Sequence, residues 1–318
     1  MEIGFVGLGK MGGNMVLRLV HGSPDGKIVG GHRIVGFAKD PNPDLVGVHG
    51  VTVVGTLEEM VAKLRSPRVV WVMVPAGAAT ETVISSLAKM MQPDDVLIDG
   101  GNSHYKDSVR RAEGLSARAL GFLDVGTSGG IWGRQEGYCM MVGGAGPMVE
   151  DCKPILDTLA PKDGWIHTGP AGSGHFVKMV HNGIEYGMME AYAEGFEVLH
   201  KAPFPIKLDQ VASVWNHGSV IRSWLLELAE TVLKKEADLH SIAPYVVDSG
   251  EGQWTIQVAM EQAVPVPVMA AALFARYASR DPENFAARFT AALRNQFGGH
   301  AIKKAEETKI QATGEVKK

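Results

Sequence analysis

Four polar side chains recur at helical spacing in one short stretch of the sequence: Lys178, His181, Asn182 and Glu185. At about 100° of rotation per residue, the four fall within about 100° of one helix circumference, and most of the other side chains are apolar. A polar stripe on an otherwise apolar, buried helix faces a cavity, a polar network or a ligand, because buried polar groups need partners. The stripe therefore predicts the wall of an active site where protons are exchanged with a bound molecule. A solvent-facing stripe on an ordinary packed helix is the alternative.

The helix that carries this stripe is expected to extend from Ser173 to Glu190. Ser173 lies between two glycines and has a residue type favoured at helix N-caps, and no helix-breaking residue follows before Gly183. Gly183 and Gly187 each cost about 1 kcal/mol relative to alanine inside a helix. They indicate close approach of another helix or of a ligand.

The first residues of the chain carry a dinucleotide-binding pattern. A short apolar strand over 2–6 leads directly into a GxGxxG motif, and helical character follows. In that context the motif supplies a tight turn, close backbone approach to a pyrophosphate, and a helix N-terminus directed at its charge. The candidate cofactor-binding residues are Gly7, Leu8, Gly9, Lys10, Met11, Gly12, Lys39, Val74, Pro75, Ala76 and Asn102.

The end of the expected second strand, 32–38, bears on the choice of cofactor. NAD-binding domains usually place an acidic residue there, whereas NADP-binding domains place a cation. The order Ala38, Lys39, Asp40 favours NADP over NAD, and Asp40 keeps NAD open. A solvent-exposed loop lysine is the alternative interpretation of Lys39.

Strands and helices alternate up to about residue 170. Further strands are expected at 69–74, 95–99, 138–142 and 165–168, and helices at 57–64, 80–91 and 147–159. The alternation predicts a parallel doubly wound sheet, whose ligands bind beyond the carboxyl ends of its strands. That rule selects the loops 74–77, 100–103 and 126–130. In the last of these, glycines beside Ser128 leave backbone N–H groups able to face an anion, unless the segment is an ordinary glycine-rich turn.

The second half of the chain is expected to be helical. Helices are predicted at 191–200, 208–216, 221–236, 256–263, 267–279 and 284–295. We therefore expect an α/β N-terminal Rossmann-type doubly wound sheet over 1–170, an all-α C-terminal domain over 171–302 and a polar tail over 303–318. The glycines at 169–172 mark the boundary between the two domains.

Composition limits the other functions. With 31 basic and 35 acidic residues the formal charge is −4, which gives no footprint for nucleic acid or an anionic membrane. The N-terminus has no signal-peptide pattern and no apolar run reaches about 18 residues, so a cytoplasmic protein is expected. Cys139 and Cys152 have no metal-ligand spacing, and we expect both to be inert core residues and no metal to be bound.

The glycine-rich start, GGNS at 100–103, TSGG at 127–130, KMVHNGIEYG at 178–187 and RNQFGGH at 294–300 occur in one order. Together they resemble decarboxylating 6-phosphogluconate dehydrogenases, in the shorter form whose helical domain is not duplicated. The resemblance implies oxidative decarboxylation of 6-phospho-D-gluconate, a sugar-acid phosphate, to D-ribulose 5-phosphate and CO2 with reduction of NAD(P)+.

The same resemblance implies roles for individual residues. Lys178 would be the base and Glu185 the acid. The implied substrate-binding residues are Asn102, Ser128, Gly129, Gly130, His181, Asn182, Tyr186, Arg276, Arg294 and His300. In the family the tail residues reach a neighbouring subunit, which implies a homodimer or a dimer of dimers.

One segment departs from the family pattern. Where longer members have KGTGKWT, residues 249–255 read SGEGQWT, so both lysines are absent and the phosphate contact falls to Arg276 and Arg294. A β-hydroxyacid dehydrogenase acting on a smaller, unphosphorylated 3-hydroxy acid is one alternative function. A catalytically silent nicotinamide-binding sensor is another. The sequence leaves open the oligomer size, the subunit that supplies Arg294 and His300, and whether the enzyme serves the pentose phosphate pathway or gluconate utilization.

Overall fold

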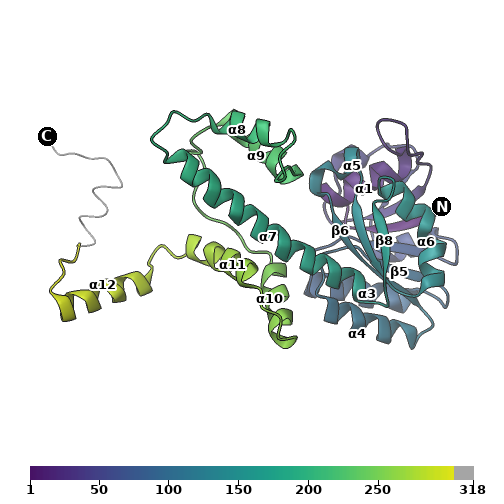
Figure 1. The fold of residues 1–318 in the computed structure, drawn as a ribbon. Helices are drawn as coiled ribbons and strands as arrows, with labels where there is room; N and C mark the ends of the chain where they lie inside the picture. The colour runs from purple at the N-terminus through teal and green to yellow at the C-terminus, as the bar shows by residue number, and fades with distance from the viewer. Residues whose placement is uncertain (304–318) are drawn as a thin grey trace. The chain divides into compact units, whose positions relative to one another are not determined.

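The computed structural model describes residues 1–303; the expected polar tail lies outside the described residues from 304 onward. Eight strands alternate with helices in the first half of the chain (Figure 1). The strands are β1 Glu2–Val6, β2 Arg33–Phe37, β3 Val51–Val54, β4 Val69–Val72, β5 Val96–Asp99, β6 Gly121–Ser128, β7 Cys139–Gly143 and β8 Trp165–Gly169. The helices between them are α1 Lys10–His21, α2 Leu57–Lys63, α3 Ala78–Met90, α4 Tyr105–Ser116, α5 Gly133–Glu136 and α6 Gly146–Leu159, with short 3-10 turns η1 Pro43–Leu45 and η2 Gly130–Trp132.

All eight strands belong to one sheet, in the order β3-β2-β1-β4-β5-β6-β7-β8. Every neighbouring pair is parallel except β6 and β7, which are antiparallel. The predicted Rossmann-type doubly wound sheet is therefore confirmed. Strands β3 and β6 and helix α4 were not predicted. Strand β3 is only four residues long and half-buried at the edge of the sheet.

Helices cover both faces of the sheet, as alternation along the strands requires. Ile3 and Phe5 of β1 pack into one core with apolar residues of α1 and α6. Val6 of the same strand packs into a second core with residues of α2, α3 and α4. The two cores keep the sheet rigid and fix the carboxyl ends of its strands, where the candidate site lies.

The helical part begins with one long helix, α7 Ser173–His200. The sequence predicts two helices here, and the structure shows 28 uninterrupted residues. The junction at 190–191 holds no proline or glycine, so nothing in the chain ends the first helix. The later helices are α8 Leu208–Trp215, α9 Trp224–Lys235, α10 Glu251–Glu261, α11 Pro267–Ser279 and α12 Phe285–Gly298, and within 170–303 no strand follows β8.

The chain forms two compact units. The first comprises 1–188 and 250–269, and the second, within the described residues, comprises 189–249 and 270–303. The first unit thus holds the sheet, the first half of α7 and all of α10. In the second unit, α8 and α9 pack on the last turns of α7 through Leu208, Ala212, Leu226 and Leu233.

Two further expectations need correction. Residues 126–128 are not loop but the last residues of β6, paired with β7. Cys152 is buried, and burial raises the pKa of its thiol to about 12, whereas Cys139 is exposed rather than in the core. Cys139 is the first residue of β7, where the strand leaves the core.

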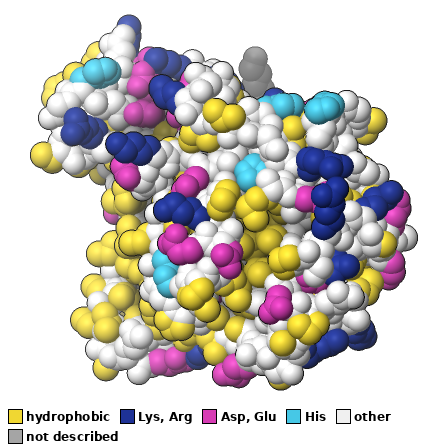
Figure 2. Space-filling view, turned by 90° about the vertical axis from the view of Figure 1, so that its right-hand side faces the viewer, with side chains coloured by type: hydrophobic (Ala, Val, Ile, Leu, Met, Phe, Trp, Pro, Cys, Tyr) yellow, Lys and Arg dark blue, Asp and Glu magenta, His cyan; other side chains and the backbone are white. Residues whose placement is uncertain are grey.

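No helix within residues 1–303 is both long enough and apolar enough to cross a membrane. In the same residues, no group of three or more His, Cys, Asp or Glu side chains is arranged to hold a metal ion. On the face shown in Figure 2, acidic and basic side chains are interspersed, with exposed hydrophobic groups between them.

Candidate active site

The first turn of α7 is held by a carboxylate from the sheet. Asp124, in the middle of β6 and fully buried, accepts hydrogen bonds from the N–H groups of Gly172 at 2.6 Å and His175 at 2.8 Å. The predicted N-cap, Ser173, bonds instead to the hydroxyl of Thr168 at 2.8 Å. That prediction is therefore wrong, because Asp124 already fills the position where a local cap would act. A negative charge at a helix N-terminus is also favoured by the helix dipole.

Helix α7 lies very close to the strand that carries Asp124. A Cβ atom at Gly126 of β6 would come within 2.3 Å of Cβ of Lys178, and only glycine permits this approach. Further along, Cβ atoms at Gly183 and Gly187 would meet Thr255 of α10 and Val268 of α11 at 2.8 and 3.3 Å. The predicted close approach of other helices at these glycines is confirmed.

The predicted polar stripe forms a hydrogen-bonded group. Its centre is His181, with Nδ1 at 3.4 Å from Nζ of Lys178, 3.0 Å from Oδ1 of Asn182 and 3.8 Å from Oε2 of Glu185. Nε2 of His181 is 3.5 Å from Oγ of Ser128 at the end of β6. Lys178 and Asn182 are buried, at 7% and 8% exposure, and the side chains of His181 and Glu185 are about two-fifths exposed.

An apolar side of α7 next to the polar stripe differs from expectation. The sequence predicts that its apolar side chains are buried, but Val177, Ile184 and Met188 are between 39% and 49% exposed. At about 100° of rotation per residue, these three residues fall on one side of α7. Only one face of this half of the helix is therefore covered by the first unit.

Burial lowers the pKa of Lys178, since removal from water disfavours the ammonium form. The negative charges of Glu185, Glu251 and Cys139 act in the opposite direction and are the smaller causes. The resulting amine is easier to deprotonate than an ordinary lysine. Such a lysine, at the edge of a Rossmann-type sheet, is suited to act as a base.

Asn102 is exposed on a loop, and buried hydrogen bonds hold the residues on either side of it. Asp99, the last residue of β5, accepts hydrogen bonds from Gly101 N–H at 3.2 Å and Ser103 Oγ at 2.7 Å. Arg111 of α4 donates to both Asp99 Oδ2, at 3.0 Å, and Ser103 Oγ, at 3.2 Å. This buried network fixes the loop and directs Asn102 outward.

The loop that contains Gly129 and Gly130 is tied to the glycine-motif helix. Asn14 of α1 donates to the carbonyl oxygen of Ile131 at 3.2 Å. Arg18 of α1 is buried and donates to the carbonyl oxygens of Arg134 at 3.0 Å and Gln135 at 3.2 Å. The cofactor helix thus donates hydrogen bonds to the residues that directly follow the predicted substrate loop.

The three glycines of the motif have distinct surroundings. Gly7 has φ +97°, and a Cβ there would lie 2.1 Å from the carbonyl oxygen of Met73. A Cβ at Gly12 would lie 1.9 Å from the carbonyl oxygen of Gly7, whereas a Cβ at Gly9 would meet nothing within 4 Å. The first and third glycines serve the fold, and the second leaves open space where a pyrophosphate could approach, as the motif predicts. Lys10 is exposed and Leu8 buried at the same turn.

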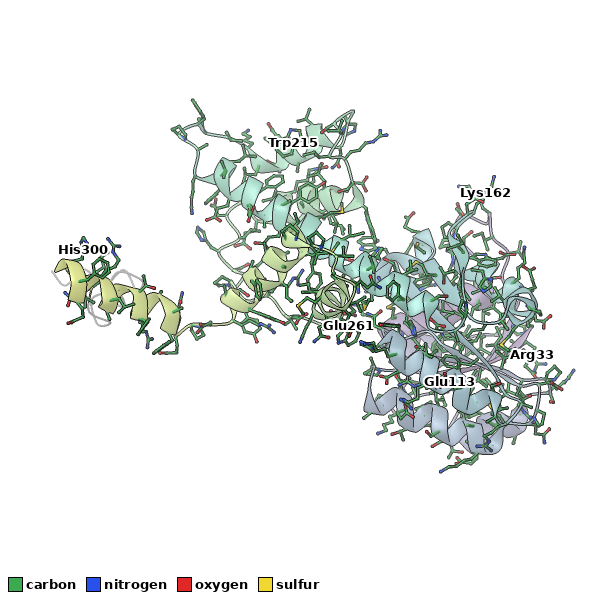
Figure 3. All side chains as sticks on the ribbon, turned by 60° about the horizontal axis from the view of Figure 1, so that its bottom comes forward. Arg33, Glu113, Lys162, Trp215, Glu261 and His300 are labelled. Carbon is green, nitrogen blue, oxygen red and sulfur yellow. The ribbon has the colours of Figure 1, made fainter. Side chains whose placement is uncertain are left out.

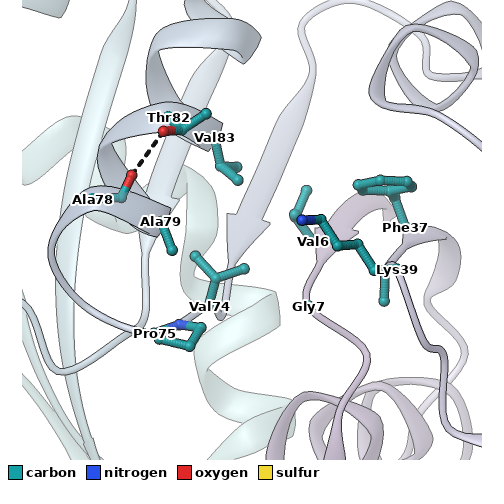
Figure 4. A pocket seen from close by; sticks show the side chains of 11 residues that line it. Val6, Gly7, Phe37, Lys39, Val74, Pro75, Ala78, Ala79, Thr82 and Val83 are labelled. Carbon is teal, nitrogen blue, oxygen red and sulfur yellow. Dashed lines mark hydrogen bonds between the residues drawn. The ribbon is translucent and has the colours of Figure 1, made fainter.

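A cavity of about 500 Å³ opens beside this turn (Figure 4). Lys39 and Phe37 lie on one side of Gly7, and Val74, Pro75 and Ala79 lie on the other (Figure 4). Of the residues that line the cavity in the described chain, Lys39 is the one with a charged side chain. The predicted cofactor residues from β1, β2 and β4 are thereby brought together.

The remaining predicted residues fall in different parts of the fold. Tyr186 is 6% exposed, and its ring lies against Gly252 of α10, where a Cβ would approach to 2.5 Å. Arg276, Arg294 and His300 belong to the second unit. Arg276 donates to the carbonyl oxygen of Val247 at 3.1 Å. His300 follows α12 (Figure 3), where its carbonyl oxygen accepts a bond from Asn295.

The chain is thus built as a Rossmann-type oxidoreductase with an NAD(P)-binding domain, followed by helices that place a buried lysine at the edge of the sheet. The description "NAD binding domain of 6-phosphogluconate dehydrogenase" matches residues 2–169, and "6-phosphogluconate dehydrogenase, C-terminal domain" matches 174–315. The chain belongs to the 6-phosphogluconate dehydrogenase family.

Individual relatives agree with this membership. A Bacillus subtilis protein provisionally named 6-phosphogluconate dehydrogenase YqeC is 42% identical, over 96% of this chain and 100% of its own length. The NAD(+)-dependent, decarboxylating 6-phosphogluconate dehydrogenase of Haloferax volcanii is 40% identical over the same shares. The solved 6-phosphogluconate dehydrogenase of Plasmodium falciparum, described with NADP+ and with 6-phosphogluconate, superposes with a TM-score of 0.75 at 29% identity, over 98% of this chain and 68% of that one.

Proposed function

We propose that the protein oxidatively decarboxylates 6-phospho-D-gluconate to D-ribulose 5-phosphate and CO2 while reducing NAD(P)+. The observation that carries this proposal is Lys178, a buried lysine of lowered pKa, hydrogen-bonded to His181 in the same compact unit as the glycine motif. The names of the Haloferax and Plasmodium relatives support the substrate.

The residues present fit a nicotinamide dinucleotide. Open space at Gly9, the N-terminus of α1 and the cavity beside Gly7 suit a pyrophosphate and its adjoining ribose. When bound, the nicotinamide supplies an acceptor for the hydride that leaves C3 of the sugar acid.

Lys39 supports a preference for NADP, since its ammonium group could pair with a 2′-phosphate at the cavity. Relatives carry names of both kinds, NAD for Haloferax and NADP+ for Plasmodium. Replacement of Lys39 by Glu tests the preference: the ratio of kcat/KM for NADP+ to kcat/KM for NAD+ should fall by at least about tenfold, an ion-pair effect of about 1.4 kcal/mol. An unchanged ratio would show that Lys39 does not bind the 2′-phosphate of NADP.

Neutral Lys178 accepts the proton of the C3 hydroxyl group as hydride leaves C3. The product of that step is a β-keto acid, which loses its carboxylate as CO2 while the electron pair moves onto the C3 carbonyl oxygen. Lys178, now protonated, donates to that oxygen and stabilises the enediolate. Donors on the carbonyl oxygen are sufficient for this step.

Glu185 supplies the proton that completes the reaction. It protonates the carbon that carried the carboxylate, which becomes C1 of the product. Glu185 lies about 10 Å along α7 from Lys178, at 1.5 Å per residue. That separation lets the two groups act at different atoms of the substrate, and His181 lies between them.

The binding residues follow from the family motifs. Asn102, Ser128, Gly129, Gly130, His181, Asn182 and Tyr186 would contact the sugar acid, and Arg276, Arg294 and His300 would contact its phosphate end. Arg276 and Arg294 carry planar guanidinium forks, which bind phosphate well. No other cation takes the place of the lysines absent at 249 and 253 in the same segment.

We also propose that two copies of the chain assemble. In α12 no residue is buried, yet four apolar side chains recur every four residues, Phe285, Phe289, Leu293 and Phe297, with exposures between 47% and 78%. A helix of 14 residues is marginal alone in water, so this stripe needs a covering surface. A second copy that covers it would also order Arg294 and His300. Phe289→Asp should shift the mass in solution from dimer to monomer; an unchanged mass would contradict the proposal.

The activity is tested with purified protein, 6-phosphogluconate and either NADP+ or NAD+, by following cofactor reduction and trapped CO2 together. Equal amounts of both products are expected. Reduction without CO2 would limit the enzyme to dehydrogenation. No reduction would overturn the proposal and direct attention to a smaller 3-hydroxy acid.

A further inference from the structure

A buried carboxylate that is not among the predicted site residues influences Lys178 electrostatically. Glu251 is the first residue of α10 and only 3% exposed. Its Oε2 atom is buried and has no hydrogen-bond partner among residues 1–303. An ionised oxygen in this state is unfavourable, because it has lost water and gained no donor.

The first turns of α10 pack against the half of α7 that carries Lys178. The hydroxyl of Thr255 donates to the carbonyl oxygen of Met179 at 2.8 Å, and Thr255 also fills the space at Gly183. Gly252 lies against the ring of Tyr186. The backbone of Glu251 therefore cannot move away from α7 without breaking these contacts.

Electrostatics connect Glu251 with the reacting group. Its charge raises the pKa of Lys178 and opposes the effect of burial on the same amine. The other charged or titratable groups that face Lys178 are His181 and Glu185 on α7 and Cys139 on β7. Among these, Glu251 is the fully buried carboxylate, since the Glu185 side chain is 40% exposed.

We propose that Glu251 is a specificity residue of the proposed reaction, whose Oε2 accepts a hydrogen bond from a hydroxyl group of the sugar acid bound at Lys178. This inference rests on the proposed function. A hydroxyl group supplies the donor that Oε2 lacks, and binding then satisfies an atom that the free protein leaves unpaired.

The chemistry of this position excludes an anionic group. A carboxylate accepts hydrogen bonds and repels phosphate or carboxylate oxygens. The segment 249–255 has Glu251 and no lysine, whereas the longer members of the family have two lysines there. In this chain the segment thus contacts the neutral polyol part of the substrate, and the phosphate is directed to cations elsewhere.

The test uses Glu251→Gln, Glu251→Ala and the control Glu261→Gln in the full-length protein. Glu261 lies at the other end of α10 (Figure 3), exposed and paired with Lys106. For Glu251→Ala we expect the KM for the sugar-acid phosphate to rise about 10- to 100-fold, as for a hydrogen bond to a charged group, and the KM for the cofactor to stay within about twofold. Glu251→Gln keeps an acceptor without its charge and should lie between wild type and Glu251→Ala.

Thermal unfolding separates binding from a structural role. The Tm of Glu251→Gln should equal or exceed that of wild type, because the variant removes a buried, unpaired charge. The acid limb of its kcat/KM profile should also move to lower pH, since Lys178 loses a negative neighbour. A fall in Tm that accompanies the loss of activity, or an unchanged KM for the sugar-acid phosphate in both variants, would overturn the inference.

The two proposals fail in different ways. If wild type turns over 6-phosphogluconate and both Glu251 variants do so with normal KM, the function stands and the inference is removed. If wild type shows no turnover, the proposed function fails. The rise in Tm on addition of D-gluconate is then measured for wild type and for Glu251→Ala. An equal rise in wild type and Glu251→Ala would remove the inference as well, and a smaller rise in the variant would support it.

Discussion

Two buried carboxylates on elements that contact α7, Asp124 on β6 and Glu251 on α10, are opposite in their hydrogen bonding. Each Asp124 oxygen accepts a backbone N–H from the start of α7, whereas Oε2 of Glu251 has no partner among the described residues. A carboxylate whose bonds are all made inside the protein stabilises the fold. A buried carboxylate with an unpaired oxygen lowers the stability of the free protein. A ligand that donates a hydrogen bond to that oxygen recovers the lost free energy when it binds.

Lys178, like Glu251, is a buried ionisable group that serves the reaction rather than the fold. Its replacement should have the largest effect on activity. We expect Lys178→Met to lower kcat by about 10²- to 10⁴-fold, the contribution of a general base. Its free energy of unfolding should not fall, because burial of an ammonium group is unfavourable. Steady-state kinetics and urea unfolding measure the two quantities. Lys162→Met, at an exposed lysine (Figure 3), should change neither, and wild-type turnover by Lys178→Met would refute the assignment.

Asp124→Ala should give the reverse pattern, with stability lost first. Two N–H groups at the start of α7 lose their acceptor, and the free energy of unfolding should fall by about 2–4 kcal/mol. Asp124→Asn retains one acceptor oxygen and should lose less. Urea unfolding measures the difference, with Asp151→Ala on the surface of α6 as the control. Unchanged stability in Asp124→Ala would remove the distinction between the two carboxylates.

Asp99 extends the comparison, because its carboxylate is also satisfied inside the protein. Arg111→Lys keeps a positive charge near Asp99 but loses the fork that also reaches Ser103 and Glu81. We expect a loss of about 1–2 kcal/mol in unfolding free energy and a higher KM for the sugar acid, since the loop of Asn102 loosens. Arg118→Lys, which is exposed, is the matched control. A change in KM for the cofactor alone would indicate that the loop serves a different ligand.

The last prediction concerns the pH dependence of hydride transfer alone, because Glu185→Gln also removes the proposed acid and should lower the rate of complete turnover. Glu185 raises the pKa of Lys178, so Glu185→Gln should lower that pKa. Because the base acts when deprotonated, the acid limb of the kcat/KM profile should then move to lower pH. A move to higher pH would mean that Glu185 and Lys178 are not coupled as the structure indicates. Glu190→Gln, five residues further along α7 and exposed at an intermediate level, serves as the comparison.

Patterns within short segments predicted most of this architecture. The sheet, the glycine motif and the stripe from Lys178 to Glu185 depend on periodicity and local turns, which the sequence displays directly. The acceptor at the start of α7 could not be predicted in this way, because Asp124 lies about fifty residues earlier, within a strand. Glu251 was missed because the helix was expected to begin at 256, and its burial depends on packing between α7 and α10. Polar residues inside otherwise apolar strands, such as Asp124, are the one local sign of such contacts.

The surroundings of the three motif glycines indicate which of them can be replaced in related chains. Gly7 and Gly12 are restricted by the backbone around them, because a Cβ atom at either would lie within about 2 Å of a carbonyl oxygen. Gly9 has no such neighbour, and an alanine there would disturb nothing in the protein itself. A requirement for glycine at this position therefore points to the nucleotide. We expect a homologue that loses only this glycine to keep the fold and to bind the nucleotide less tightly.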